Sequence, residues 1–320
     1  MRDTLEGLIK ERKCLLEELG SLPEPKVVNK EWLYLLKEET RNSILIEGFF
    51  VSEEELEEVL SGKSETRSGR EALNYFKTAK FVYELAYENY KEGEFLFGIP
   101  LIRQINKSLG YTGELRKGSV KIAGASFTPP SDYLEEWLTI FAKAVKNLNL
   151  KDIDFNYLAV LHAFFEEIHP FNDGNGRTGR ILLNYILISG GYPLVILKGD
   201  ENSKGEYYKG LEEIDGQLVE VFQQYRRNPP KEEEIIHTLE GVKSKKLKKL
   251  ILNALRESLD RLILSYAEER EPLKPVSTLL KELGYSPSGV RKLIERGKII
   301  AVKRNNRWYS AKSLVGKLLR

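Results

Sequence analysis

A polar segment between two long apolar patterns constrains this chain more than any other feature of its sequence. Residues 155–168 carry apolar side chains at the three- and four-residue spacing of a helix. Pro170 ends that pattern at His169, and a glycine-rich stretch follows it. A second apolar helical pattern starts near Arg177. The segment therefore predicts two helices joined by a tight turn.

The turn gathers residue types that suit a nucleotide. Backbone amides at the start of a helix form an anion site suited to phosphates. Arg177 and Arg180 are three residues apart, so they share a helical face and can clamp a polyphosphate. Asp173 offers the hard oxygen ligand that Mg²⁺ on a nucleotide requires. His169 has a reference pKa of about 6.5 and is a candidate base for a hydroxyl that attacks phosphorus.

Two other interpretations of the glycines compete with this one. The spacing Gly174-x-Gly176-x-x-Gly179 matches a dinucleotide-binding fingerprint, but that motif must follow a buried strand, whereas here a helical pattern and a proline precede it. The segment has no Gly-Lys-Ser/Thr, which excludes a Walker loop. A purely structural helix–loop–helix explains the glycines alone, but it gives no reason for a His, an Asp and two Arg in one turn.

Helical patterns cover most of the rest of the chain. One runs over residues 5–19 and stops at Gly20, and Ser52 with Glu55 makes a capping box that starts another. Residues 61–69 are polar and predict a loop. Residues 110–131 differ, because Gly-x-Gly spacing and alternation there predict a short β-hairpin.

The stretch from His169 to Arg180 resembles the Fic-family motif His-Pro-Phe-x-(Asp/Glu)-Gly-Asn-Gly-Arg-x-x-Arg at every defined position. The similarity extends from about Phe95 to Tyr225 and includes a flap-like segment, Val120-Lys121-Ile122-Ala123-Gly124. The resemblance implies a mainly α fold, with a Fic-type helical core and a small β-hairpin flap. It also implies that AMP moves from ATP to a Tyr, Thr or Ser hydroxyl of a protein, with pyrophosphate leaving. The chain itself is one candidate target.

The same resemblance implies a role for each motif residue. His169 is the base, Asp173 holds Mg²⁺, and glycine at positions 174 and 176 favours AMP transfer over the phosphate transfer of Doc-type relatives. Some relatives have Asn where this chain has Asp215. The residues expected around ATP are Ile122, Gly124, Asp173, Gly174, Asn175, Gly176, Arg177, Thr178, Gly179, Arg180, Tyr207, Tyr208 and Asp215.

Ser43 and Glu47 are four residues apart, on one face at the end of a helical pattern. Taken alone, Glu47 is a surface residue before a terminating glycine, because a helix C-terminus does not favour an anion. The segment also resembles the Fic inhibition motif Ser/Thr-x-x-x-Glu-Gly/Asn. That resemblance implies that Glu47 pairs with Arg180 and leaves the α-phosphate of ATP misaligned. Removal of AMP from a modified protein is a second activity found among such relatives.

The end of the chain reads as helix, turn, helix and hairpin between residues 276 and 309, and it is rich in basic side chains. This order resembles excisionase-like winged helix-turn-helix modules. Duplex DNA is the partner implied, with Arg291 and Lys292 on the recognition helix and Arg304 and Arg307 on the wing. A small protein-docking domain is the other interpretation.

We expect four regions: an N-terminal helical region with the inhibitory helix (1–94), the Fic core (95–228), a charged helical linker (229–270) and the winged helix-turn-helix (271–320). The alternative to an adenylyltransferase is a DNA-binding transcriptional regulator whose Fic core senses nucleotide or modifies itself. The sequence does not decide the oligomeric state, and a homodimer stays open.

Composition limits which partners, cross-links and locations we expect for this chain. Net charge is only +2, so a nucleic-acid role must come from local clusters. A single cysteine, Cys14, allows no internal disulfide and no thiolate metal cluster. We expect no membrane span, because no apolar run approaches the length that a bilayer requires, and we expect a cytoplasmic location.

Overall fold

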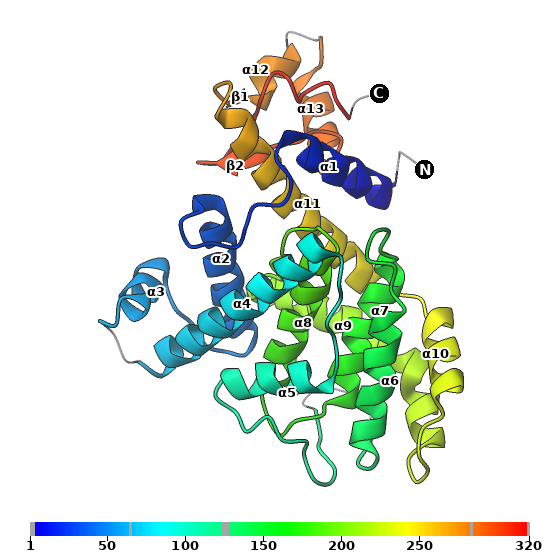
Figure 1. Ribbon diagram of the computed structural model, residues 1–320. Helices are drawn as coiled ribbons and strands as arrows, with labels where there is room; N and C mark the ends of the chain where they lie inside the picture. Colours follow the sequence, from blue (N-terminus) through cyan, green and yellow to red (C-terminus); the bar gives the residue numbers. More distant parts are fainter. Residues whose placement is uncertain (1–3, 64–65, 123–127, 282–283, 319–320) are drawn as a thin grey trace. The chain divides into compact units, whose positions relative to one another are not determined.

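The structure is a computed structural model that describes residues 4–63, 66–122, 128–281 and 284–318. These residues are mainly helical (Figure 1). The chain forms two compact units, which we call the central unit (residues 36–251) and the terminal unit (residues 1–35 with 252–320). The four expected regions stay a prediction. Among the described helices, none has the length and apolar character needed to cross a membrane.

The elements follow one another in this order: α1 (Leu5–Leu19), α2 (Lys30–Ile46), α3 (Glu53–Leu60), α4 (Arg67–Glu92), α5 (Ile99–Ser108), α6 (Leu134–Lys146), α7 (Phe155–Ile168), α8 (Asn175–Ser189), α9 (Glu201–Gln224), α10 (Glu232–Gly241), α11 (Lys246–Glu268), β1 (Lys274–Pro275), α12 (Val276–Lys281), α13 (Pro287–Glu295), β2 (Val302–Arg304) and β3 (Arg307–Ser310).

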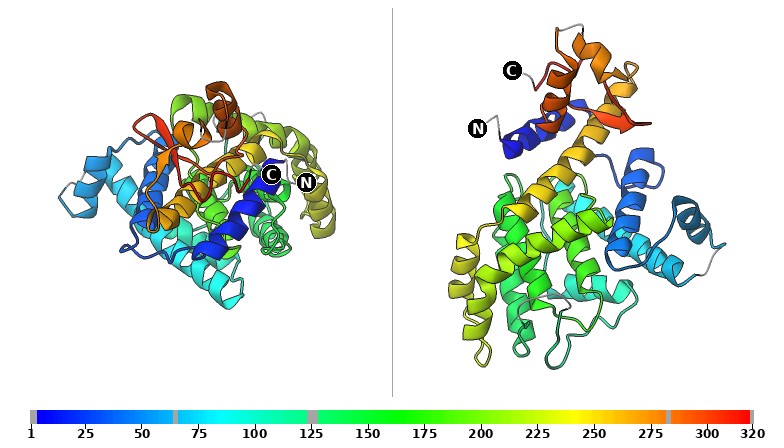
Figure 2. Two further views of the ribbon diagram at one scale, coloured as in Figure 1. Left: turned by 90° about the horizontal axis from the view of Figure 1, so that it is seen from above. Right: turned by 180° about the vertical axis from the view of Figure 1, so that it is seen from behind.

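The core of the central unit is built around the helix pair α7 and α8. Helix α8 packs against α4, α5 and α7, and α7 also contacts α6 and α9 (Figures 1 and 2). Nearly every residue of α8 is buried, which fits a helix whose apolar side chains lie on all its faces. Aromatic side chains fill the space on the other side of α7, where the Trp137 ring lies 4.9 Å from that of Phe222. These helices hold the turn at residues 169–174 on a rigid base.

Local sequence signals account for several helix boundaries. Helix α1 ends before Gly20 as predicted, and the Ser52 hydroxyl caps α3 by accepting a hydrogen bond from the Glu55 amide. The prediction of a loop over 61–69 is wrong at its end, because α4 already begins at Arg67. The Thr66 hydroxyl caps that helix by accepting from the Gly69 amide, which makes an early start favourable.

The hairpin predicted over 110–131 is not found in the residues described there. Residues 110–122 and 128–131 contain no strand, and residues 123–127 lie outside the described part of the chain. The two prolines at 129 and 130 lack the amide hydrogens that a strand ladder needs. The Arg116 side chain organises the segment instead, by donating to the backbone carbonyls of His169, Gly118, Pro130 and Ile168.

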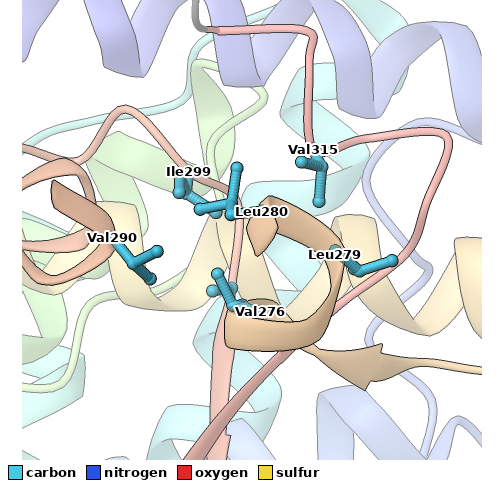
Figure 3. Packing of buried hydrophobic residues seen from close by; sticks show 7 residues of the cluster. Val276, Leu279, Leu280, Val290, Ile299 and Val315 are labelled. Carbon is cyan, nitrogen blue, oxygen red and sulfur yellow. The ribbon is translucent and has the colours of Figure 1, made fainter. Parts of the chain in front are cut away.

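The terminal unit contains a three-stranded antiparallel sheet in the order β1-β3-β2. The predicted hairpin is present, and Asn305 and Asn306 form its tip with positive φ angles of 46° and 62°. No sequence pattern predicts the two-residue strand β1. Helices α12 and α13 share an apolar core with the segment after α13 and the chain's end, formed by Val276, Leu279, Leu280, Val290, Ile299, Ala301 and Val315 (Figure 3).

Helix α1 belongs to this terminal unit although the sequence places it far from the sheet. The Arg12 side chain is fully buried and pairs with Asp260 of α11, at 2.6 Å between Nε and Oδ1. Its Nη2 also donates to the carbonyls of Gly297 and Ile299, at 2.8 and 3.2 Å. One guanidinium thus links α1, α11 and the approach to the hairpin.

Candidate active site

The turn after α7 is held by its own side chains. His169 caps α7 in the left-handed region, with φ of 48°, and Gly174 precedes α8 with φ of 78°. The Asn175 amide group bridges the turn, because its Oδ1 accepts from the Phe171 amide and its Nδ2 donates to the Phe171 carbonyl, both at 2.9 Å. The Asn106 amide donates to the Asp173 carbonyl at 2.9 Å. The Asn175 side chain is therefore committed to shaping the turn.

Glycine leaves room for close neighbours at two positions of this turn. A Cβ at Gly174 would lie 2.4 Å from the Tyr111 ring, and the positive φ already disfavours other residues. A Cβ at Gly176 would lie 2.6 Å from the Glu47 carboxylate. The two glycines thus allow close approach by an aromatic ring and by an acidic side chain.

His169 is arranged as a base. Its Nδ1 lies 3.1 Å from the backbone carbonyl of Glu166. A carbonyl oxygen can only accept, so the proton is on Nδ1 and the Nε2 lone pair is free to take another. Burial lowers the pKa of His169 below its ordinary value, which keeps the ring neutral near pH 7.

Arg180 is locked by the end of helix α2. Its Nε donates to the Ser43 hydroxyl at 2.7 Å, and its Nη2 donates to the Ser43 carbonyl at 3.0 Å and to Glu47 Oε1 at 2.6 Å. Burial by itself would raise the pKa of Glu47, but the charge and hydrogen bond of Arg180 outweigh it and hold that pKa below its ordinary value. Glu47 and Arg180 therefore form a full ion pair.

Arg177 has a different set of partners. Its guanidinium pairs with Glu71 of α4 and with the Tyr111 hydroxyl. It lies between two rings, 5.7 Å from the Phe49 centroid and 5.2 Å from that of Tyr111. Both arginines of the turn are thus held by acidic side chains from outside it.

A cavity of about 390 Å³ opens beside the turn, and Arg180 and His169 both line it. Of the residues expected around ATP, those that reach this cavity are Ile122, Gly176, Arg180, Tyr207, Tyr208 and Asp215. Gly124 lies outside the described residues. The expected contacts that do not line it are Asp173, Gly174, Asn175, Arg177, Thr178 and Gly179.

The two tyrosines of α9 are placed differently. Tyr207 is buried, and its hydroxyl lies 2.8 Å from Nε2 of His162, whose pKa burial lowers to about 3. Tyr208 is 46% exposed and forms part of the cavity rim. His162 is a neutral core histidine that contacts Tyr207 in the cavity wall.

Three acidic residues line the cavity but are not predicted as site residues from the sequence: Glu166, Glu167 and Glu212. Burial raises the pKa of Glu166 to about 8, and burial followed by the Asp215 carboxyl raises that of Glu167 well above its ordinary value. Motif spacing does not point to them. Two consecutive glutamates in an otherwise apolar helix were the available signal, since burying acidic side chains is costly.

Asp173 suits a metal ion that arrives with a nucleotide. Its side chain is 71% exposed, and its Oδ1 accepts from the Gly174 amide at 2.6 Å. Among the described residues, no group of three His, Cys, Asp or Glu side chains gathers as a metal site. Mg²⁺ commonly takes one or two carboxylates together with phosphates and waters, so a single exposed aspartate fits this mode.

The four basic residues predicted to contact DNA lie on the surface of the terminal unit. Arg291 pairs with Glu295, one turn later in α13, at 2.8 Å. Arg304 makes a two-pronged pair with Glu268, at 2.7 Å for each contact. Lys292 and Arg307 complete the exposed set.

Comparison with known proteins finds Fic/DOC relatives in both sequence and structure. The model of the Fic/DOC family matches residues 96–187. An Aquifex aeolicus protein, named a probable protein adenylyltransferase, is 35% identical over 300 residues, which is 88% of this chain and 87% of the relative. A solved Fic-domain signalling protein of Bacteroides thetaiotaomicron has a TM-score of 0.59 at 20% identity, over 80% of this chain and 97% of its own. A Fic family structure from Desulfovibrio desulfuricans has a TM-score of 0.54 at 17% identity, over 96% and 95%.

Proposed function

This chain belongs to the Fic/DOC family and is a protein adenylyltransferase, and we propose that it uses ATP with Mg²⁺ and is restrained by its own Glu47. One observation carries the proposal. A neutral histidine with a free Nε2 and an arginine held by an acidic side chain line the same cavity. The arrangement supplies a base for the reaction and a lock on the phosphate-binding group.

In the proposed reaction the hydroxyl oxygen of a protein side chain attacks the α-phosphorus of ATP. The hydroxyl proton passes to Nε2 of His169, the bond between the α-phosphorus and its bridging oxygen breaks, and pyrophosphate leaves. Positioning and charge stabilisation do most of the work in such transfers. The hydrogen bond from Nδ1 of His169 to the Glu166 carbonyl fixes the ring for this role.

Asp173 would hold the Mg²⁺, which would screen the charge of the phosphates when bound. The amides at the start of α8 would donate to phosphate oxygens, because they have no acceptor within the helix. Arg180, once released, would add a bidentate contact to the end of the triphosphate. Arg177 supports the turn through Tyr111 and Glu71 and would contribute positive charge from beside the cavity.

Glu47 accounts for the restraint. While its carboxylate accepts from Nη2 of Arg180, that guanidinium is not available to the γ-phosphate, and a carboxylate beside Gly176 repels phosphate. The hydroxyl of Ser43 holds Nε of the same arginine. Removal of AMP, with Glu47 orienting a water, stays a prediction.

Intact-mass measurement tests the reaction class. The full chain is incubated with ATP and Mg²⁺, alone and with a mixture of candidate protein targets. A gain of one AMP unit on a protein, absent with the His169→Ala variant, supports the transfer. A gain of one phosphate unit, or an equal gain with the variant, would contradict it.

DNA binding by the terminal unit is a second proposal. Helices α12 and α13 followed by the β2–β3 hairpin occur in the order of a winged helix, and Arg291, Lys292 and Arg307 are exposed. Retention on duplex DNA should fall steeply with salt, and Arg291→Ala with Lys292→Ala should weaken it. The proposal would be excluded if retention on duplex DNA did not change with salt, or if the double substitution left it unchanged.

A further inference from the structure

Glu167 is an acidic side chain buried in the apolar helix α7, which is unusual for a helix core. It is 2% exposed, it lines the cavity beside the turn, and its carboxyl lies beside another carboxyl, that of Asp215, while no other described residue donates a hydrogen bond to it. Buried polar atoms in native proteins are almost always paired, and an orphaned one is costly. An acidic group left open toward a cavity is explained if a ligand supplies the missing donor.

A second acidic side chain lies beside it. Asp215 of α9 is 8% exposed, lines the same cavity, and its carboxyl contributes to the raised pKa of Glu167. Two neighbouring buried carboxyls cannot both ionise readily, so the pair shares one proton and carries a single negative charge. Apart from the shared proton, this part of the wall presents hydrogen-bond acceptors.

The position of the pair decides which part of a nucleotide it meets. The other acidic and basic side chains that line the cavity are Glu47, Glu166, His169, Arg180, Lys209 and Glu212, and the two tyrosines, Tyr207 and Tyr208, also line it. Arg180 and the start of α8 attract phosphates, whereas an acidic pair repels them. A triphosphate bound in this cavity would therefore lie toward Arg180, and its base would then face Glu167 and Asp215, beside the buried ring of Tyr207.

We infer that Glu167 together with Asp215 selects the nucleobase by accepting a hydrogen bond from an exocyclic amino group. This inference rests on the proposed function, which makes the cavity a nucleotide site. Adenine donates a hydrogen bond from its 6-amino group, and the carboxyl oxygens of the pair can accept it. A 6-keto base places lone pairs there instead and leaves the buried acceptors unpaired, which sites built for a hydrogen bond reject strongly.

ATP and inosine triphosphate are the matched pair of ligands for the test, because they differ at this amino or keto group. Calorimetric titration of the full-length chain carrying Glu47→Gly measures binding of each, with Mg²⁺ present. We expect ATP to bind at least about tenfold more tightly, the equivalent of one hydrogen bond. Equal binding of the two nucleotides would overturn the inference.

Three further substitutions, each made in the Glu47→Gly chain, test whether Glu167 and Asp215 cause the preference for ATP. Glu167→Leu should bring the ATP preference to within about twofold. Glu167→Gln should keep it, because an amide donates to Asp215 and still offers a carbonyl acceptor, as the protonated acid does. Asp215→Asn should narrow the preference, since its amide can donate to a keto group. Glu220→Gln, exposed on the same helix, is the matched control.

Each outcome has a defined consequence. A preference that survives both Glu167→Leu and Asp215→Asn would overturn the inference, and circular dichroism checks that each variant is folded. If Glu167→Leu does not fold, the other two variants still test the inference. Asp215→Asn must narrow the preference for ATP over inosine triphosphate, and Glu167→Gln must leave that preference unchanged. If neither nucleotide binds while the chain is folded, the proposed function itself fails. Binding without base preference rejects only the inference.

Discussion

At the scale of single residues, the account depends on where protons reside. His169 must be neutral to accept a proton, and Arg180 must be charged to bind phosphate. Burial lowers the pKa of His169, and Glu47 raises that of Arg180 above its ordinary value against the opposing effect of burial. Both groups are therefore in their active protonation states near pH 7.

The lowered pKa of His169 predicts the pH profile of transfer. Because the ring is active when neutral, a lower pKa extends activity toward acid. In the Glu47→Gly variant, the rate should stay level from pH 8 to about 6.5, the pKa of a free histidine, and decline only below it. Initial rates with labelled ATP across pH measure this. A half-maximal rate at or above pH 6.5 would contradict the assignment of His169 as the base.

The motif residues could be predicted from the sequence, because their types and spacing suffice to suggest phosphate chemistry. The partners that restrain them could be predicted only in part. Glu47 was indicated by a motif resemblance, whereas Glu71 holds Arg177 across more than a hundred residues of chain and no spacing rule reaches that far. Glu167 is another such residue, because its role depends on helix α9 lying beside it.

At the scale of elements, helix α2 carries a buried acidic residue, Glu39, in line with Ser43 and Glu47, the two residues that hold Arg180. Glu39, Ser43 and Glu47 recur every four residues, and so share one face. Glu39 is 3% exposed and accepts a hydrogen bond from the Tyr75 hydroxyl of α4. Burial raises its pKa to about 8, although Tyr75 and the charge of Arg180 oppose this.

This shift predicts how stability depends on pH. Glu39 binds its proton more tightly in the folded chain, so the stability it contributes is full below pH 4.5 and is lost as pH rises toward 8. Urea unfolding at pH 5 and pH 8 should show that the free energy of unfolding declines less for Glu39→Gln than for the wild type, by about 3 kcal/mol. Glu166 acts in the same direction, so some decline remains. Identical declines in the two proteins would refute the buried, protonated state.

Helices with clear caps and apolar periods were predicted well, and irregular segments were not. Helix α7 has the predicted bounds, since Asp154 caps its start and Pro170 prevents its extension. The segment at 110–131 alternates like a strand, but its described residues are held by the contacts of Arg116 and not by a ladder. Such long-range side-chain contacts leave no local sequence signal.

At the scale of the whole molecule, the two ends of the chain fold together. Residues 1–35 join residues 252–320 in the terminal unit, and Arg12 and Asp260 form a buried ion pair within it. No local sequence signal indicates this pair, because Arg12 and Asp260 are 248 residues apart.

The Arg12 pair predicts a cost for breaking it. Replacing Arg12 by Met keeps most of the apolar stem but leaves Asp260 buried without its cation, which should cost about 3–5 kcal/mol. Hydrogen exchange of α11 residues 252–268 and of β3 should accelerate, while helix α8 of the central unit should be unaffected. Unchanged exchange in the terminal unit would show that the pair does not hold it together.

The central claim is that Glu47 restrains an otherwise complete adenylyltransferase. The most direct measurement compares AMP incorporation from labelled ATP by the wild type, Glu47→Gly and Glu47→Gly with His169→Ala, at equal protein and Mg²⁺ concentrations. The account predicts low incorporation by the wild type, an increase of about tenfold or more on removal of Glu47, and a return to background when His169 is also replaced. Equal incorporation by the wild type and Glu47→Gly would contradict it.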